Sequence, residues 1–415
     1  MENAIKDWRG RAYLPGPVPA DRARMFGLAW GAMAAISPLQ YGYAALLAGE
    51  APGLALVAAW IACQAMGALP ALHLVRRGSL GVRPCLAAGA VLSCAGLATA
   101  ALPVGGPGAL VGYALLGGLG AGLVYGVCGE VVSAWYPERP AARVALITGA
   151  FGYGAVPLLV WAGIAPGATG AAFLVAAVVA AAVIGAAARN LRLPPSLWWP
   201  GDVDPRTHAL DAARLRAIPE ASRQFRLGQA LRTPALAALA LVLVCAGAVS
   251  VFDVIVVAGT GSWGAAAVLV ALNGAGRSAA VRCSELFGRR RVLATVLTAL
   301  AAGQVLLAAA LHDGTTPGGG PLLWLGAVAA GLGGGAFYPL LAGLVREFFG
   351  VERAGEIHAV VYSAKALAGV AAVALALLAL GSPVAALGLA AALACVPALA
   401  VPRLRVPGLP ATLPL

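Results

Sequence analysis

The sequence predicts an all-α polytopic membrane protein, with twelve transmembrane helices arranged as two six-helix halves. Composition is the first observation behind this prediction. Of the 415 residues, 61% are hydrophobic and 11% are charged, whereas a soluble domain carries about 25% charged residues. The second observation is a series of apolar segments long enough to cross a bilayer as helices. The third is a single long polar stretch in the middle of the chain.

Twelve apolar segments predict the twelve helices. Each is close to the roughly 20 residues that a helix needs to span a hydrocarbon core of about 30 Å. The alternation expected of a membrane β-barrel is absent. In chain order the segments are residues 25–49, 53–75, 85–102, 108–135, 144–164, 170–188, 234–257, 263–281, 292–311, 322–345, 357–380 and 384–401.

The basic residues of the loops predict the orientation of the chain. All loop Lys and Arg residues lie on one side, and the opposite loops contain only Glu50, His312 and Asp313 as ionisable residues. Because Lys and Arg favour the cytoplasmic side, both termini are predicted to be cytoplasmic in a multi-pass protein of the plasma (inner) membrane. The net charge of +12 lies mostly in these short loops, which indicates the lipid bilayer as a partner and excludes nucleic acid.

The long polar stretch divides the chain into predicted domains. These are an N-terminal six-helix half (1–188), a cytoplasmic middle loop (189–233) and a C-terminal six-helix half (234–415). The middle loop begins with several prolines and tryptophans and continues with a mixed-charge run, which is compatible with a helix lying on the membrane surface. A linker between the two halves is the simplest interpretation of this loop.

The two halves contain an internal repeat. Gly118-Leu-Gly-Ala-Gly-Leu-Val-Tyr125 in the fourth predicted span matches Gly331-Leu-Gly-Gly-Gly-Ala-Phe-Tyr338 in the tenth. An even number of spans in each half predicts parallel repeats about an axis normal to the membrane. The glycines predict smooth faces on which helices approach each other closely.

Two basic residues lie inside apolar spans. Arg277 precedes Glu285 by eight residues, and Lys365 follows Glu356 by nine. At about 1.5 Å per helical residue both lie roughly 12–14 Å deep, near the midplane. A charged residue at this depth usually faces a protein interior and has a function, so the pair predicts an anion site. The alternatives are a structural ion pair for Lys365 and membership of the nearby basic turn for Arg277.

That basic turn lies between the eighth and ninth predicted spans. It reads Ser284-Glu285-Leu-Phe-Gly288 and continues with Arg289, Arg290 and Arg291. A carboxylate beside a basic turn at a helix end can hold neighbouring helices together. Glu285, Arg289 and Arg290 are therefore predicted to form a cytoplasmic charge turn.

These features together resemble the major facilitator superfamily over nearly the whole chain. Within it, the sequence is similar to the oxalate:formate antiporter family. The matching motifs are Gln40-Tyr41, Gly120-Ala-Gly-Leu-Val-Tyr125, Trp135-Tyr136-Pro137, Asn273-Gly-Ala-Gly-Arg277 and Ala364-Lys365-Ala366. The resemblance implies that Arg277 and Lys365 bind substrate carboxylates, and that Gln40, Tyr41 and Tyr125 line the cavity.

The chain departs from this family at two places. Gly78 stands in the first-half charge turn where the superfamily usually has Asp. Gly331 and Gly335 stand where oxalate-specific members place large aromatic residues. The second departure predicts an enlarged cavity and a substrate other than oxalate.

Three further residues complete the predicted site. Tyr338 is the repeat partner of Tyr125, and is predicted either to contact substrate or only to pack. Glu130 and Asp253 are buried acids that are predicted to neutralise the two cations or to carry a proton. Glu130 has a second interpretation, an interaction with arginines at the cytoplasmic end of its span.

The sequence therefore predicts a secondary active transporter, an antiporter or a proton-coupled transporter, that moves a small organic anion such as a mono- or dicarboxylate and acts as a monomer. The alternatives are an efflux transporter of another small molecule and a membrane sensor that does not transport. The seven cysteines are scattered without metal-ligand spacing, and no catalytic cluster or phosphate loop is evident. No cofactor, no metal and no enzymatic activity are expected.

Overall fold

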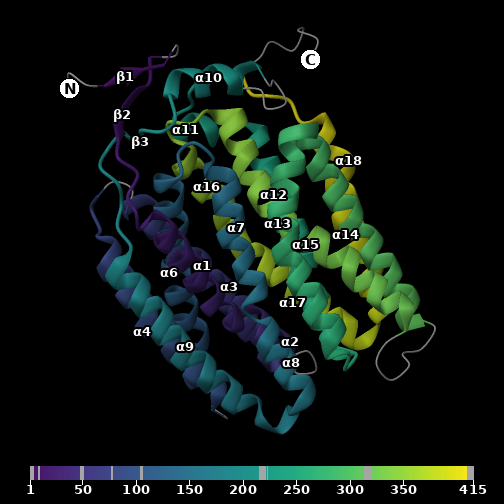
Figure 1. Cartoon of the computed structure of the whole chain (residues 1–415). Coiled ribbons are helices and arrows are strands. Elements are labelled where there is room, and N and C mark those ends of the chain that lie inside the picture. Colours follow the sequence, from purple (N-terminus) through teal and green to yellow (C-terminus); the bar gives the residue numbers. More distant parts are fainter. Residues whose placement is uncertain are drawn as a thin grey trace.

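Figure 1 shows the computed structural model of the chain, which describes residues 4–7, 10–46, 51–75, 78–102, 106–214, 221, 223–312 and 320–408. Helices from the earlier part of the chain, purple to teal, and from the later part, green to yellow, lie side by side as two bundles (Figure 1). Short elements cover one end of the bundles. We call this the basic end, because Arg139, Arg143, Arg289 and Arg346 lie there, and the other the opposite end.

The first bundle contains the helices that precede the middle segment. In chain order they are α1 (Arg22–Ala35), η1 (Pro38–Gly42), α2 (Tyr43–Leu46), α3 (Ala51–Pro70), η2 (Ala71–Val75), α4 (Val82–Ala101), α5 (Gly106–Ala109), η3 (Leu110–Gly117), α6 (Gly118–Trp135), α7 (Pro140–Tyr153), α8 (Val156–Ile164), η4 (Pro166–Ala168) and α9 (Thr169–Asn190).

The second bundle contains α12 (Pro234–Gly259), α13 (Trp263–Phe287), α14 (Arg289–His312), α15 (Pro321–Phe349), α16 (Ala354–Ser363), α17 (Lys365–Gly381), α18 (Pro383–Ala400) and η5 (Val401–Arg403). Local chemistry explains several of their ends. Thr233 caps α12 by accepting a hydrogen bond from the Leu236 amide at 3.4 Å, as an N-cap hydroxyl does. α13 ends at Gly288, whose φ of 85° is a left-handed conformation that favours glycine.

Eleven helices in the described part of the chain are long and apolar enough to cross a membrane. They correspond to the second to twelfth predicted spans. The first predicted span is α1, η1 and α2, and its residues 47–49 lie outside the described residues. Its helix is interrupted at Ile36, and a π-helical segment follows from Pro38, because proline lacks the amide that would continue the α-helical pattern.

The two bundles contact each other mainly through α7 and α8 against α13, α3 against α17, and α2 against α12. Glycine residues allow the closest approach, which is between α7 and α13. A Cβ atom on Gly152 of α7 would lie 2.6 Å from the Gly274 amide nitrogen and 2.7 Å from the Val270 carbonyl of α13. Both neighbours are backbone atoms, so the two helices meet without side chains between them.

The glycines of the internal repeat face equivalent neighbours. A Cβ atom on Gly118 would lie 2.7 Å from the Trp60 carbonyl of α3, and one on Gly331 would lie 2.6 Å from the Leu269 carbonyl of α13. Four residues further on, Gly122 and Gly335 approach the carbonyls of Gln64 and Asn273. The repeat therefore places Gln64 and Asn273 at corresponding positions of the two bundles.

The middle segment does more than link the bundles. It contains β3 (Trp198–Pro200), α10 (Pro205–Arg214) and α11 (Leu227–Ala230). β3 pairs in parallel with β2 (Ala12–Gly16), which also pairs with β1 (Ile5–Lys6) in an antiparallel ladder. The helix predicted from the mixed-charge run is α10, which lies across the basic end (Figure 1). Next to the sheet, Arg22 forms an ion pair with Glu138 at 2.6 Å.

Candidate substrate-binding site

Lys365 is buried at the junction between α16 and α17, and its side chain is 4% exposed. Its Nζ donates hydrogen bonds to Oε1 of Gln40 at 3.1 Å and to Oε1 of Gln64. Nζ also lies 5.7 Å from the ring centroids of Phe151 and Tyr362. The ammonium group of the second bundle is therefore held by amide oxygens and aromatic faces, chiefly of the first bundle.

Arg277 of α13 is buried as well, with 2% of its surface exposed. Its Nη1 donates to the carbonyl oxygen of Thr148 at 2.8 Å, and its Nη2 donates to Oδ1 of Asn273 at 3.2 Å. Its Cζ lies 5.1 Å from the Tyr338 ring centroid. The Thr148 contact again joins the second bundle to the first.

The two cations belong to one site, because they share two aromatic neighbours. Arg277 Cζ lies 6.0 Å from the Phe151 centroid and Lys365 Nζ lies 5.7 Å from it. The Tyr338 ring lies 5.1 Å from the first and 5.9 Å from the second. Among the described residues neither cation forms an ion pair with a carboxylate. Burying charge without a counter-charge is costly, so the site favours an anion.

Tyr41 and Asn273 connect the first bundle to this site. The Tyr41 hydroxyl donates to Oδ1 of Asn273 at 3.2 Å, the same oxygen that Arg277 contacts. Asn273 in turn donates from Nδ2 to the Ser250 hydroxyl of α12 at 3.0 Å. Tyr41 and Gln40 both lie in the π-helical segment η1, and such segments frequently occur at functional sites.

A cavity of about 510 Å³ separates the bundles at the basic end. Its inner part is lined by Tyr125, Tyr338, Tyr362 and Thr148. Tyr125 and Tyr362 stack with their ring centroids 5.4 Å apart. Because Tyr338 and Tyr362 also contact Lys365, the tyrosines form a layer between the cavity and the two cations.

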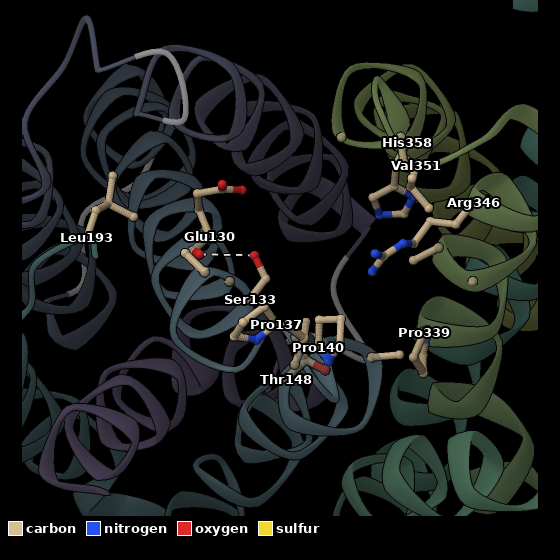
Figure 2. Close-up of a pocket in the computed structure, with 18 of the residues that line it drawn as sticks. Glu130, Ser133, Pro137, Pro140, Thr148, Leu193, Pro339, Arg346, Val351 and His358 are labelled. Atoms are coloured by element: carbon tan, nitrogen blue, oxygen red, sulfur yellow. Dashed lines mark hydrogen bonds between the residues drawn. The ribbon is translucent and has the colours of Figure 1, made fainter. Parts of the chain in front are cut away.

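Figure 2 shows residues that line this cavity. Glu130 and Ser133 of α6 lie on one side, and Arg346, Val351 and His358 lie on the other. Glu130 thus faces the basic-end cavity. Residues 193–198 of the middle segment also line the cavity, which the interpretation of this segment as a linker did not foresee.

Asp253 lies away from the two cations. Its side chain is fully buried, and its Oδ1 accepts a hydrogen bond of 2.6 Å from Nε2 of Gln304 on α14. The structure therefore places Asp253 between α12 and α14, outside hydrogen-bonding contact with Arg277 and Lys365. The predicted role as their counter-charge does not fit this position.

The charge turn differs from its prediction. Arg289 pairs with Glu347 of α15 at 3.5 Å and donates to the Gly343 carbonyl at 3.1 Å. Arg290 donates to the carbonyl of Leu404 at 2.8 Å. Glu285 is exposed, and no hydrogen bond or ion pair joins it to either arginine in the described structure. The acid in contact with Arg289 is thus Glu347, which comes from a different helix, whereas Glu285 acts on Arg289 only through its charge.

The predicted effect of Gly331 and Gly335 on the cavity is also wrong. A Cβ atom at either position would meet the backbone of α13, and neither residue lines the cavity. These glycines let α15 pack closely on α13. In this conformation an aromatic side chain would separate two helices of one bundle and would not fill the cavity.

Sequence reasoning missed Gln64 and Phe151, and gave Asn273 no binding role. Gln64 had a visible signal, because it is a strongly polar residue near the centre of an apolar span. Phe151 had none, because an aromatic residue in an apolar span is usually a packing residue. No group of three His, Cys, Asp or Glu residues in the described part of the chain is placed to hold a metal ion.

The chain shares its fold with solved transporter structures. A POT family transporter in complex with 5-aminolevulinic acid superposes with a TM-score of 0.67 and 14% identity, covering 92% of this chain and 96% of that one. The nucleoside transporter NupG gives a TM-score of 0.64 and 13% identity, covering 92% and 99%. The peptide transporter POT gives 0.66 and 14%, covering 92% and 94%.

These similarities show a major facilitator-type fold in an integral, multi-pass membrane protein. At such low identity they show the fold alone. No family model and no curated protein matches the sequence. The oxalate:formate antiporter family receives no specific support.

Proposed function

We propose that this protein is a secondary active transporter that moves a small organic anion, a mono- or dicarboxylate, by alternating access. The observation that carries the proposal is the pair of buried cations, Arg277 and Lys365, which share the rings of Phe151 and Tyr338 and contact no carboxylate among the described residues. The anion is the group that this arrangement lacks.

The oxygens that now contact Arg277 and Lys365 bind them less strongly than a carboxylate would. Lys365 is bound by two neutral amide oxygens, and Arg277 by a backbone carbonyl and an amide oxygen. A carboxylate oxygen adds a Coulombic attraction between opposite charges, which a neutral amide or carbonyl oxygen does not supply. A carboxylate replaces neutral partners by a charged one, and this gain is available only to an anion.

The two cations are suited to different parts of a carboxylate ligand. The planar guanidinium of Arg277 can bind both oxygens of one carboxylate, while the ammonium of Lys365 is a compact charge on a flexible stem. A dicarboxylate engages both groups at once. A zwitterion such as an amino acid or a peptide also needs an acid near its ammonium group. Glu130 lines the cavity, but neither buried cation has a carboxylate in contact among the described residues, so the pair of cations favours an anion over the ligands named for the POT structures.

The same contacts support a transport cycle. We assign the basic end to the cytoplasm, because its loops carry the Lys and Arg residues, which favour that side. The bundles meet closely where α7 crosses α13 and are separated by the cavity at the basic end, which corresponds to an inward-facing state. Both cations already bridge the bundles, so an anion that binds them more tightly in a closed state draws the bundles together.

Counterflow in proteoliposomes tests this proposal. Vesicles with the purified protein are loaded in turn with formate, acetate, lactate, pyruvate, oxalate, malonate or succinate, and uptake of the labelled anion is measured. We expect saturable uptake of at least one anion by the wild type and its loss in Lys365→Gln. Lys6→Gln removes the only other lysine of the chain, which is exposed, and should keep wild-type uptake.

Two results would count against the proposal. Uptake that survives Lys365→Gln places the anion elsewhere. No uptake of any anion, in vesicles shown to be sealed and loaded, favours a different substrate class or a sensor.

A further inference from the structure

Asp253 and Gln304 form an isolated polar pair deep in the second bundle. Asp253 lies six residues before the end of α12 and Gln304 lies eight residues before the end of α14, so both are in the half of the helices away from the basic end. Both side chains are fully buried. Gln304 Nε2 donates to Asp253 Oδ1 at 2.6 Å and to the carbonyl of Leu300 at 3.4 Å.

The remaining polar atoms of this pair have no hydrogen-bonding partner in the part of the chain that the structure describes. These atoms are Oδ2 of Asp253 and Oε1 of Gln304. The Leu300 carbonyl is an acceptor, and it therefore fixes which end of the Gln304 amide is the nitrogen. Both orphan atoms are acceptors, and both lack a donor. Buried polar groups nearly always have a hydrogen-bonding partner. What the pair lacks is a hydrogen-bond donor for Oδ2 and Oε1.

No charged neighbour supplies a donor to Asp253 in the described structure. α12 packs against α2, α13, α14, α15, α16, α17 and α18. The titratable groups on the inner and opposite-end parts of these helices, among the described residues, are Tyr43, Arg277, His312, Tyr338, Tyr362 and Lys365. None of them is hydrogen-bonded or ion-paired to Asp253 in the described structure. A carboxylate here would be buried with a single neutral donor, which is costly.

One proton accounts for both orphan atoms. When Oδ2 carries a proton, Asp253 is neutral and Oδ2 becomes a donor to Oε1 of Gln304. Together with the bond from Nε2 to Oδ1, this second bond would complete the two-bond pairing that a carboxylic acid and a primary amide can form. We propose that Asp253 and Gln304 are a proton-binding site, occupied in the conformation described here, and that transport of the anion is coupled to this proton. The coupling rests on the proposed function, whereas the proton site does not.

A chain of hydrogen bonds runs from the anion site to Ser250, one helical turn from Asp253. Arg277 contacts Asn273, and Asn273 contacts Ser250 of α12. Ser250 precedes Asp253 by three residues, and residues at this spacing are neighbours on a helix surface. A change in the charge or position of Asp253 therefore occurs one helical turn from the hydrogen bonds that hold Arg277.

Infrared spectroscopy of the purified protein tests the proton site without any substrate. We expect a band of a protonated carboxylic acid in the wild type that is lost in Asp253→Asn. Asp204→Asn, which changes an exposed acid of the middle segment, should leave the band intact. If Asp253→Asn does not fold, Gln304→Met should shift the same band, because the acid loses its partner. No such band in the wild type, or a band that every variant keeps unchanged, overturns the proposal.

Transport assays test the coupling. Counterflow exchanges one anion for another without net proton movement, whereas accumulation under an imposed pH gradient requires it. We expect Asp253→Asn, which mimics the neutral acid, to keep counterflow and to lose gradient-driven accumulation. Two results would overturn the coupling: accumulation by Asp253→Asn equal to that of the wild type, or accumulation by the wild type that does not depend on the pH gradient. Neither result affects the anion proposal. Absence of counterflow in the wild type sinks the anion proposal, and the infrared band still decides the proton site.

Discussion

Single residues determine whether the central site is positive or neutral. Lys365 and Arg277 are held by oxygens that carry no net charge, from Gln40, Gln64, Thr148 and Asn273. A neutral amide satisfies the donors of a cation and preserves its field, whereas a carboxylate at the same place would cancel it. The neutral amide of Gln64 thus leaves the positive charge of Lys365 available for the proposed anion.

Replacing Gln64 by glutamate should abolish anion uptake without destabilising the protein. The new carboxylate has nearly the same shape and pairs with Lys365, so the substrate has to compete with an internal counter-ion. Thermal unfolding should show a melting temperature equal to or above that of the wild type, while counterflow is lost. Gln229→Glu, at an exposed position of α11, serves as the control. Unchanged uptake by Gln64→Glu would show that Lys365 does not bind the anion.

Replacing Gln64 by leucine should have the opposite effect on stability. The Lys365 ammonium then loses one of its two hydrogen-bond acceptors, and leaving a buried donor unpaired costs about 1–3 kcal/mol or more when it is charged. Thermal unfolding should detect this loss, and saturating anion should restore part of it. A melting temperature that is unaffected by the substitution would contradict the role of Gln64.

At the scale of elements, helix contacts place these residues, and the sequence anticipated only part of them. The apolar segments and the glycine repeat predicted which stretches are helices and which helix faces are smooth. They did not predict that η1 presents Gln40 and Tyr41 from a π-helical segment, or that Glu347 pairs with Arg289. Such contacts join helices far apart in the chain, and no local spacing encodes them.

The crossing of α7 and α13 provides a prediction at this scale. Gly152→Ala places a Cβ atom within 2.6 Å of the Gly274 backbone nitrogen, so the helices must separate. Overpacking of this kind costs about 1–3 kcal/mol. Gly185→Ala in α9, where no atom lies within 4 Å of the new Cβ, should be neutral or stabilising, since alanine favours helix by about 1 kcal/mol. Thermal unfolding of both variants measures the difference, and equal stabilities would show that the crossing is not tight.

At the scale of the whole molecule, the two bundles contact each other at the candidate site itself. The sequence predicted both cations and their common depth, because a charge inside an apolar span is conspicuous. It included Tyr338 in the predicted site but not Phe151, which comes from the other bundle and carries no local signal of a binding role. The cavity is lined by both bundles and by the middle segment, so all three parts contribute to the path that we assign to the substrate.

Anion binding should close the cavity at the basic end. A cysteine introduced by Ser133→Cys lines this cavity and should react with a membrane-impermeant thiol reagent added at the basic end. The exposed Cys283 and Cys395 are first replaced by serine. Transported anion should slow the labelling of this residue but not of Asp204→Cys, which is exposed outside the cavity. Equal labelling rates with and without anion would contradict closure of the bundles around substrate.

Equilibrium binding of a transported anion to the purified protein tests the central claim most directly. Isothermal titration of wild type, Arg277→Gln, Lys365→Gln and the double variant forms a double-mutant cycle, with the exposed Arg282→Gln as the control. Because hydrogen bonds to charged groups contribute about 1.5–3 kcal/mol, each single variant should weaken binding by roughly tenfold or more. The two effects should be non-additive, since both cations hold one ligand. Wild-type affinity in either single variant would contradict the account.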